Sequence, residues 1–296
     1  MKKLSLMSLI LSMTIFGTIG IFRNYILFPS AFLAMARGFI GTAFILLFLV
    51  ITKKGIDFSA IKKNLIILVL TGAFIGINWI LLFEAYKNTT VAVATLCYYM
   101  APLFVTVASS IFLKEKLTLK KVICITLAIS GMILVSGVVD GSLSGASDLI
   151  GILLGLGAAI FYASVTLVSK KVKDISSFDM TLVQLFSAAV VVMPYSLLFE
   201  DVTFQGTSTT AILFVLIVGI LHTGIAYVMY FTSVKNLEAS KVAIFSYLDP
   251  LIAIILSALI LKEKMTVAIG IGAALILLSA FVSEVNFSVF RKKAEK

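Results

Sequence analysis

Four ionisable side chains lie deep inside long apolar stretches of this 296-residue sequence, and they are its best candidates for chemistry. They are Arg37, Glu84, His222 and Asp249. A charge at the centre of a lipid bilayer costs at least about 2.5 kcal/mol even on the gentlest scale. Residues of this kind therefore indicate binding of an ion or a small molecule, or pairing inside the protein.

Asp249 directly precedes Pro250 in the middle of an apolar stretch. Proline has no backbone N–H, so a carbonyl of the preceding turn loses its partner and the helix can bend there. A carboxylate beside a freed carbonyl favours a cation or proton site. The alternative is that Asp249 braces a neighbouring helix through a hydrogen bond.

His222 is the only histidine of the chain. An imidazole titrates close to neutral pH, which suits proton coupling, but a lone histidine equally serves as an interhelical hydrogen-bond donor. The two cysteines, Cys97 and Cys124, lie in apolar runs and have no partner at metal-ligand spacing. We therefore expect no metal site.

Arg37 and Glu84 are expected to form a structural or gating ion pair. Arg37 lies in the second predicted membrane helix and Glu84 near the outer end of the third. An unpartnered charge at that depth is expensive, which favours the pair. Contact between Glu84 and a transported molecule is the competing role.

Polar and aromatic side chains recur along one face of the predicted helix at residues 90–113. Thr95, Tyr99 and Pro102 follow one another at steps of four and three, so a 3.6-residue period places them together, facing an internal cavity. Trp79 and the tyrosines could instead belong to the aromatic belt at the membrane surface. The predicted cavity-lining residues are Asn78, Trp79, Glu84, Thr95, Tyr98, Tyr99, His222, Tyr227, Ser246, Tyr247 and Asp249, with Arg37, Pro102 and Pro250 in structural or gating roles.

The elements that carry these residues follow from composition. Hydrophobic residues make up 61% of the chain and charged residues only 13%, which is too apolar for a soluble globule of this length. A helix needs about 20 mainly apolar residues to cross a bilayer. The sequence therefore predicts an all-α integral membrane protein with ten transmembrane helices, at residues 4–22, 31–52, 64–86, 90–113, 120–138, 148–170, 179–199, 209–233, 240–261 and 266–285.

The net charge of +10 arises from brief basic clusters between apolar stretches, such as Lys53-Lys54 and Lys62-Lys63. These clusters indicate membrane topology rather than nucleic-acid binding, because short cytoplasmic loops are enriched in Lys and Arg. With ten spans, most of them fall on one side, together with the basic segment 287–296. Both termini are therefore predicted to be cytoplasmic.

The two halves of the chain carry the same landmarks in one gapless register. Tyr99 and Tyr247 are 148 positions apart, and Leu113-Lys-Glu-Lys116 recurs as Leu261-Lys-Glu-Lys264 at the same offset. Such self-similarity predicts a duplication, with repeats at residues 1–140 and 146–286 and a basic tail at 287–296. Because each repeat holds five helices, an odd number, the second repeat has inverted topology relative to the first.

These landmarks resemble the drug/metabolite transporter superfamily of the EamA type, over nearly the whole chain as two tandem domains. The shared pattern is a mid-helix Pro-Leu followed by a terminal Leu-x-Glu-[Arg/Lys], seen here after Pro102-Leu103 and again after Pro250-Leu251. The resemblance implies export of amino acids, drugs or other metabolites through a cavity lined mainly by the third, fourth, eighth and ninth helices. A Lys stands where a Gly often precedes the Glu, and the pattern does not identify the cargo.

Inverted duplication, a proline in one helix of each half and intramembrane ionisable groups together predict a secondary active transporter, an exporter or exchanger working by alternating access. The expected cargo is an amino acid or related metabolite, with protons as a candidate coupling ion. An organic cation or drug is the alternative.

An intramembrane enzyme is less favoured, since the sequence has no His-Glu-x-x-His or Gly-x-Ser-x-Gly motif, and the lack of a Walker motif argues against direct use of ATP. A channel or a lipid-handling protein is a further alternative, which flux measurements in proteoliposomes distinguish from a transporter. We expect no enzyme activity, no cofactor and no nucleic-acid partner. The expected partners are a small-molecule substrate and the lipid bilayer, for a monomer or homodimer in the plasma membrane of a prokaryote.

Overall fold

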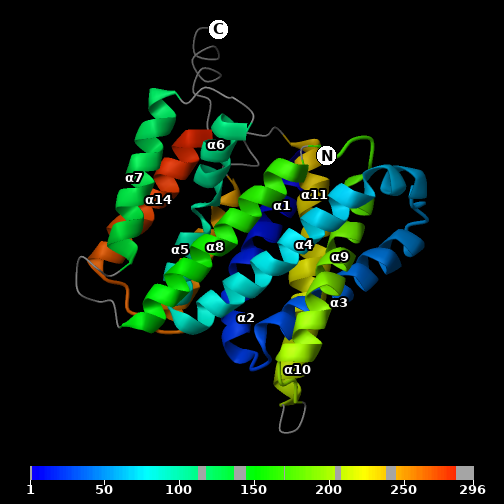
Figure 1. The fold of residues 1–296 in the computed structure, drawn as a ribbon, viewed down its shortest axis with the longest axis horizontal. Coiled ribbons are helices and arrows are strands. Elements are labelled where there is room, and N and C mark those ends of the chain that lie inside the picture. Colours follow the sequence, from blue (N-terminus) through cyan, green and yellow to red (C-terminus); the bar gives the residue numbers. More distant parts are fainter. Residues whose placement is uncertain are drawn as a thin grey trace.

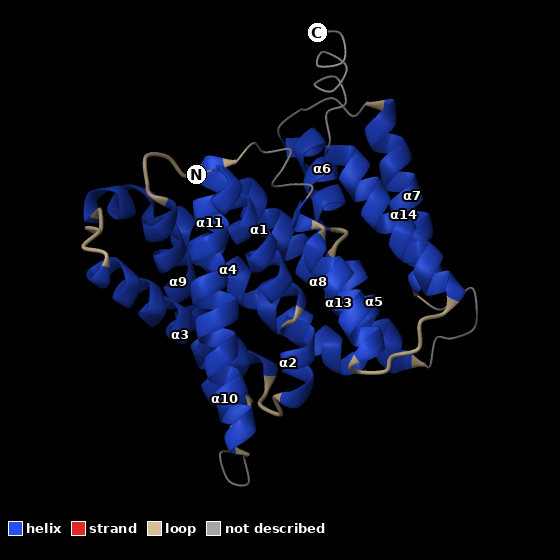
Figure 2. Cartoon of the chain, turned by 180° about the vertical axis from the view of Figure 1, so that it is seen from behind, coloured by secondary structure: helices blue, strands red, loops and turns tan. Residues whose placement is uncertain are grey.

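The structure, a computed structural model, describes residues 2–112, 118–136, 145–169, 171–203, 208–237 and 245–284. Within these ranges every regular element is a helix (Figure 2). The predicted all-α class is confirmed. The helices are α1 (Lys2–Gly17), α2 (Ile19–Tyr25), α3 (Ser30–Ile51), α4 (Phe58–Asn88), α5 (Val91–Tyr98), α6 (Ala101–Phe112), α7 (Leu119–Val135), α8 (Ala146–Ser169), α9 (Ser177–Phe199), α10 (Thr209–Ile217), the π-helix η1 (Val218–Ile225), α11 (Ala226–Asn236), α13 (Leu248–Leu259) and α14 (Val267–Glu284).

The described part of the chain holds ten apolar helical segments close to the positions that the sequence predicts. Seven stretches are long and apolar enough to cross a bilayer on their own: Lys3–Tyr25, Ser30–Ile51, Phe58–Asn88, Val91–Ala108, Ala146–Ser169, Ser177–Phe199 and Thr209–Tyr230. The other three, α7, α13 and α14, are apolar but shorter. Two predicted features lie partly or wholly outside the described residues: the start of the stretch 240–261, and the motif Leu113-Lys-Glu-Lys116.

The third segment differs most from its predicted bounds, because α4 begins at Phe58 rather than at residue 64. The carboxylate of Asp57 caps the helix by accepting a hydrogen bond from the Ala60 backbone N–H at 2.9 Å. Lys62 and Lys63, which the sequence predicts to precede the membrane helix, lie exposed on its first turns. A lysine pair is compatible with a helix end because the long side chains reach water.

The helices are related by approximate two-fold symmetry. An element close to such an axis contacts its own copy, and α3 packs on α9, α5 on α13 and α7 on α14. Figure 1 shows α7 and α14 side by side at one edge of the molecule. Other contacts occur as related pairs, since α4 packs on α8 as α11 packs on α1. The two inverted five-helix repeats therefore form one interlocked bundle.

Two glycines bring α4 directly against the backbone of α9. A Cβ added to Gly72 would lie 2.6 Å from the Gln184 carbonyl oxygen, and one added to Gly76 would lie 2.9 Å from the Ala188 carbonyl oxygen. Small residues at this spacing allow helices to approach closely in a membrane, where packing rather than hydrophobic burial holds them together. The contact fixes the first repeat on the second.

Four membrane segments are interrupted near their middle. A turn at Thr18 separates α1 from α2, and a turn at Tyr99 and Met100 separates α5 from α6. In the second repeat, Tyr247 forms the turn that precedes α13, and η1 widens the segment between α10 and α11. Pro102 and Pro250 each fall in the first turn after a break, where the missing N–H costs no intrahelical bond. The expected proline interruption is confirmed in both halves.

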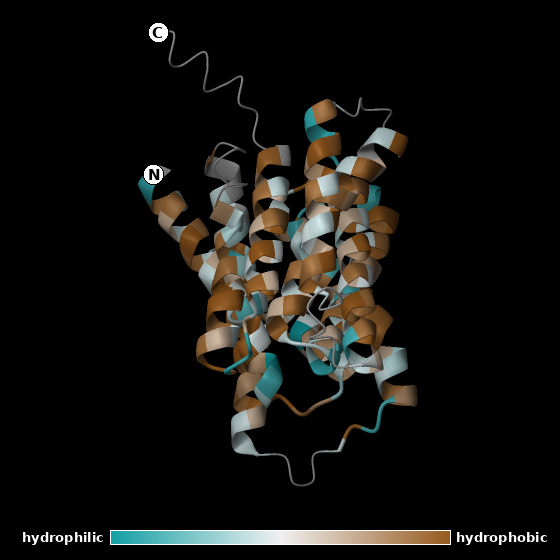
Figure 3. Ribbon diagram, turned by 90° about the vertical axis from the view of Figure 1, so that its left-hand side faces the viewer, coloured by the Kyte–Doolittle hydropathy of each residue, from teal (hydrophilic) through white to brown (hydrophobic). Residues whose placement is uncertain are grey.

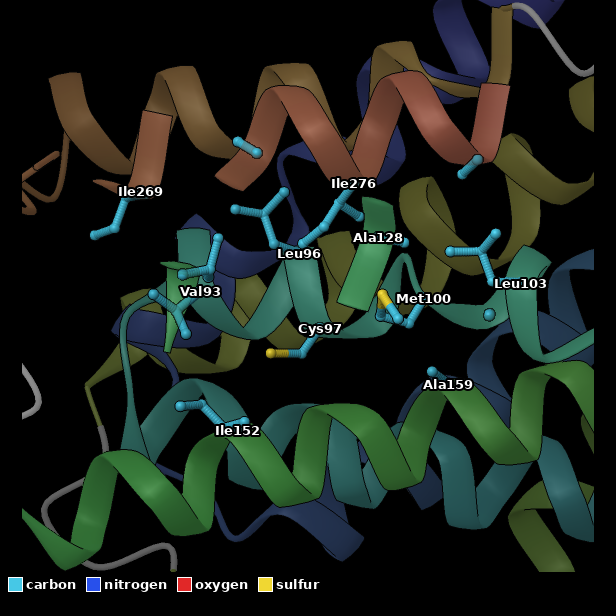
Figure 4. Packing of buried hydrophobic residues seen from close by; sticks show 14 of the residues in the cluster. Val93, Leu96, Cys97, Met100, Leu103, Ala128, Ile152, Ala159, Ile269 and Ile276 are labelled. Atoms are coloured by element: carbon cyan, nitrogen blue, oxygen red, sulfur yellow. The ribbon is translucent and has the colours of Figure 1, made fainter. Parts of the chain in front are cut away.

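The outer surface is apolar and the bundle has its own core. Leu27, Ile66 and Val267 are at least 80% exposed, as lipid-facing side chains are, and hydrophobic residues cover the sides of the bundle in Figure 3. Inside, α5 is packed between α8 and α14, with Leu96 and Cys97 fully covered (Figure 4). The chain is a multi-pass membrane protein.

Two names for the ends of the bundle are used below. The terminal end is where α1 begins and α14 ends (Figure 1). The distal end is the opposite one, where α2 ends and α5 begins.

Candidate functional site

Two equivalent tyrosines meet at the interruptions of the two repeats. Tyr99 ends α5 and Tyr247 immediately precedes α13. Their ring centroids are 6.4 Å apart. Because the two residues occupy the same position in their repeats, this contact marks the symmetry axis. The centre of the molecule is therefore a place where both breaks and both tyrosines converge.

Asp249 joins this centre from the first turn of α13. The Tyr99 hydroxyl donates a hydrogen bond to Asp249 Oδ2 at 2.7 Å. The positive end of the helix dipole in that turn favours a carboxylate. Among the described residues Oδ1 accepts no hydrogen bond, so one carboxylate oxygen remains available to a ligand.

A series of aromatic contacts extends from Tyr99, which holds this carboxylate. Tyr98 contacts Tyr99 edge to face at 5.9 Å and Tyr162 at 5.6 Å, while Tyr247 contacts Phe281 at 5.8 Å. We call Tyr98, Tyr99, Tyr162, Tyr247 and Asp249 the tyrosine cluster. Ring faces attract cations, so a carboxylate in such surroundings suits a positively charged group.

The first helix approaches the tyrosine cluster through a glycine. A Cβ added to Gly17 would lie 2.6 Å from the Asp249 carbonyl oxygen and 2.8 Å from Ile252 Cβ. No side chain fits at this position without displacing one of the helices. Gly17 therefore sets how closely α1 and α13 can approach, directly behind the carboxylate.

Arg37 is the second charged group of the core and is only 3% exposed. Its Nε donates to Thr223 Oγ1 at 3.0 Å, and Thr223 in turn donates to the Val218 carbonyl. The guanidinium carbon lies 4.1 Å from the centre of the Trp79 ring. The described residues accept no hydrogen bond from its two terminal nitrogens, which form the fork that binds carboxylates in a bidentate manner.

The predicted ion pair between Arg37 and Glu84 is wrong. Glu84 instead accepts a hydrogen bond from Lys87 Nζ at 2.7 Å, one turn before the end of α4. Lys87 lies three residues further along the same helix and therefore needs no second helix to reach the carboxylate. Arg37 is stabilised by an aromatic ring and a hydroxyl rather than by a carboxylate. Glu84 is thus placed at the distal end, away from the tyrosine cluster.

His222 lies in η1, fully buried, and bridges to the break in the first segment. The Thr18 hydroxyl is 2.8 Å from His222 Nε2 and also donates to the Ile15 carbonyl at 2.7 Å. A hydroxyl has a single hydrogen, so His222 Nε2 must be the donor to Thr18. The arrangement matches the alternative interpretation of His222 as an interhelical brace.

Some of the other predicted residues form hydrogen bonds, and others pack against neighbouring side chains. The Asn78 side chain donates to the Ala158 carbonyl at 2.6 Å, which ties α4 to α8. Thr95 lies 3.3 Å from the Tyr86 hydroxyl, and Tyr227 packs edge to face on Phe16. Ser246 precedes Tyr247 and is half-buried. None of these contacts is with Asp249.

The sequence did not indicate three residues that contact Arg37 or the tyrosines near Asp249. At the offset of 148, Thr223 and Phe281 correspond to Ile75 and Ile133 and Tyr162 corresponds to Thr14, so the duplication did not mark these positions by a repeated residue type. Thr223 is next to His222, and a polar neighbour of the lone histidine was the one hint available. The helix positions of Tyr162 and Phe281 carried no such hint.

A recess lies at the distal end. Its volume is about 240 Å³, and it is lined by Arg23, Asn24, Ile26, Leu27, Tyr86 and Lys87. Arg23 is 4% exposed and donates to the Ile26 carbonyl and to Ser30 Oγ. These bonds hold the loop between α2 and α3. We give the tyrosine cluster more weight as a site because its carboxylate and rings come from both repeats.

Comparison with known proteins identifies relatives over nearly the full length. A model of the EamA-like transporter family matches residues 3–137 and again residues 149–284. The chain is 30% identical to the uncharacterized transporter YxxF of Bacillus subtilis, over 86% of this chain and 81% of the relative. It is 29% identical to the uncharacterized transporter YoaV of the same organism, over 88% and 89%. A solved crystal structure with 18% identity superposes over 99% of both chains with a TM-score of 0.67, which indicates a shared fold.

Proposed function

Since this chain belongs to the EamA-like transporter family, we propose that it is a secondary active transporter of a small zwitterion, an amino acid or a related metabolite. It works by alternating access, as an exporter or exchanger. Uptake of protons drives the export of cargo.

The observation that carries the proposal is the presence of two opposite charges that are not paired with each other inside the bundle. Arg37 is buried against Trp79 and Thr223, and the half-buried Asp249 is bonded to Tyr99. The free terminal nitrogens of Arg37 suit a carboxylate, and the free oxygen of Asp249 suits an ammonium group. A free amino acid carries both of these groups.

Arg37 and Asp249 are suited to different parts of the task. The guanidinium is planar and permanently charged, so it positions a carboxylate without exchanging a proton. Asp249 can bind an ammonium group or a proton, but the same carboxylate cannot bind both at once with full affinity. Binding of a proton to Asp249 therefore favours release of the cargo. An antiporter needs such a competition between proton and cargo for one site.

The interruptions support alternating access. Helices broken at membrane depth are tolerated where they line a cavity, and they provide hinges near the cargo. α5 with α6 and the segment ending in α13 break at equivalent tyrosines, so either half of each pair can move while the other stays packed. The site can then open to one side at a time.

An organic cation is the second candidate, and one observation favours it. Asp249 is bonded to one tyrosine of a series of packed aromatic rings, and a carboxylate next to such rings suits a cation without help from Arg37. Removal of the Arg37 charge separates the two candidates, because it weakens zwitterion binding and leaves binding of a simple cation intact.

A thermal-shift screen with zwitterions, organic cations and organic anions tests the cargo class. A binder raises the melting temperature by mass action, and zwitterions are expected to do so. Flux into proteoliposomes then tests the mechanism, since a carrier saturates and shows counterflow whereas a channel does not. Stabilisation by cations alone, or flux without saturation, would contradict the proposal.

The same proposal includes an orientation. Lysine-rich segments between apolar stretches indicate cytoplasmic loops, so the terminal end faces the cytoplasm of a prokaryotic cell and the distal end faces outward. Accessibility of single cysteines at Lys63 and Lys264 to a membrane-impermeant reagent tests it. Labelling of the second position alone in intact cells is the expected result.

A further inference from the structure

The carboxylate of Glu263 reaches from the second repeat to the first turn of α5. Its two oxygens accept hydrogen bonds from the backbone N–H groups of Val91 and Ala92 at 2.8 and 3.2 Å. The Thr90 side chain accepts from Val93 N–H at 3.2 Å. The first N–H groups of a helix have no partner within the helix, so these three bonds complete the cap. Two of the three depend on the other repeat.

The backbone that presents Glu263 has an unusual shape. Lys262 has a φ of 57°, in the left-handed region that non-glycine residues rarely adopt. The Glu263 N–H donates back to the Ser257 carbonyl at 3.2 Å. Such a conformation persists only where the surroundings hold it in place. The end of α13 is therefore turned so that the carboxylate points at α5.

The two helices joined in this way also flank the tyrosine cluster. α5 ends at that cluster, and the Tyr99 hydroxyl bonds to Asp249 of α13. α5 and α13 pack against each other, so they are tied at the cluster by Tyr99 and at the distal end by Glu263. Both ties therefore join the same two helices, one at the centre of the bundle and one at its distal end.

We propose that Glu263 is the latch of the outer gate: its carboxylate holds α5 against α13 and keeps the cargo site closed toward the distal end. This inference rests on the proposed function, because a gate presupposes alternating access. Cargo or a proton at Asp249 loosens the inner tie, and the Glu263 bonds then set how far the outward-open form is populated. Glu263 acts on the site through α5 and contacts no cargo itself.

The chain offers a matched control in Glu200. That carboxylate makes the same kind of cap at the same end of the bundle, accepting from the N–H groups of Ala31 and Phe32 at 3.0 and 2.8 Å. However, α3 is a continuous helix packed on α9, and neither carries a residue of the tyrosine cluster. Loss of the Glu200 cap should therefore loosen a helix end without opening the gate.

Distance measurements between spin labels test the latch in the full-length protein in nanodiscs. Labels on Leu149→Cys and Leu259→Cys report the distance between α8, which packs on α5, and the end of α13. Both side chains are exposed, by 49% and 71%, so the labels disturb little packing. Cys97→Ala and Cys124→Ala remove the native thiols.

In Glu263→Ala the ratio of long-distance to short-distance populations should rise by about tenfold, because two charge-assisted hydrogen bonds are lost. Glu263→Gln keeps one acceptor oxygen, so its population ratio should lie between the ratios of Glu263→Ala and of the unsubstituted protein. Glu200→Ala should leave the distribution unchanged. Size-exclusion chromatography checks folding, and Glu263→Gln carries the test if the alanine variant does not fold.

An unchanged distribution in a folded Glu263 variant, or an equal shift in Glu200→Ala, would overturn the latch. The measurement needs no cargo, so the latch can fail while saturable transport is found. Conversely, a shifted distribution without any transport would count against the proposed function and leave the tie between α5 and α13 established.

Discussion

The two repeats share their hinges but not their chemistry. The breaks at Tyr99 and Tyr247 occupy equivalent positions. The charged residues do not, because Asp249 corresponds to Ala101 and Arg37 corresponds to Leu185. This pair of breaks is thus symmetric, while each repeat contributes one of the two charges. A duplicated fold can divide its tasks in this way. Features that both halves share govern opening, and residues in which the halves differ govern selectivity.

A second contrast lies in the helices that flank the centre. α4 is a regular helix of 31 residues, whereas its counterpart is divided into α10, η1 and α11. The wide turn carries His222 and Thr223, which correspond to Phe74 and Ile75 in α4. π-Helical turns are rare and are often found at functional sites. Here the turn brings one hydroxyl to Arg37 and one imidazole to the break at Thr18.

The largest effect is expected from removal of the charge that the second repeat alone provides. Asp249→Asn should abolish cargo flux driven by a pH gradient, because the amide neither takes up a proton nor pairs with an ammonium group. Flux is measured in proteoliposomes with the cargo found in the thermal-shift screen. Asp174→Asn, an exposed carboxylate, is the control and should transport normally. Undiminished pH-driven flux in a folded Asp249→Asn protein would refute the coupling role.

The matching test in the first repeat is Arg37→Gln. Zwitterion affinity should fall about 100-fold, since a bidentate charge-assisted contact is lost. Arg37→Lys should recover part of it, because the charge remains but the fork does not. Titration by thermal shift measures both, with Arg23→Gln as a control for loss of a buried arginine elsewhere. Equal affinity for zwitterions in Arg37→Gln would favour the organic-cation alternative.

The close contact behind Asp249 can be tested with one methyl group. Gly17→Ala should destabilise the protein by about 1–3 kcal/mol and slow transport, because the added Cβ displaces α1 from α13. Gly270→Ala is the matched control, as no atom lies within 4 Å of its added Cβ. Thermal unfolding and initial flux rates are compared. Equal stability of the two variants would show that α1 and α13 are not in tight contact.

The smallest effect is expected from His222→Phe, which gives the second repeat the residue found in the first. It removes one buried hydrogen bond, to Thr18, and should cost about 1 kcal/mol of stability. The pH dependence of transport should be unchanged, because the proposed proton carrier is Asp249. A pH profile of flux decides the matter. Loss of the pH dependence in this variant would transfer the coupling role to His222.

Much of the fold was predictable because it depends on features that repeat along the chain. Apolar stretches of membrane length predicted the ten segments, and the equivalent prolines Pro102 and Pro250 predicted an interruption in each half, which the structure places at the neighbouring Tyr99 and Tyr247. The start of α4 was misplaced, since a lysine pair marks a boundary of the membrane rather than the end of a helix. Such errors are local and do not alter the architecture.

The candidate site was predictable as a list of residues and not as a set of contacts. Asp249, Tyr99 and Tyr247 do come together, as their positions in the repeats suggested. The pairing of Arg37 with Glu84 failed because a nearer lysine takes the carboxylate. The sequence shows Glu263 as part of a repeated motif, but it does not predict the bonds of Glu263 to α5. A sequence does not show which backbone N–H groups need a partner from elsewhere in the chain.

Composition and periodicity thus specify the solvent, the number of membrane segments and the duplication, because these properties sum over many residues and tolerate local error. Partners are specified by packing in three dimensions. Whether Arg37 meets an aromatic ring or a carboxylate depends on helix rotation and on distances of a few ångströms, which a linear pattern does not encode. The fold brings Arg37 to Thr223, Tyr99 to Asp249 and Glu263 to the first turn of α5, and the partners in each contact are far apart in the chain.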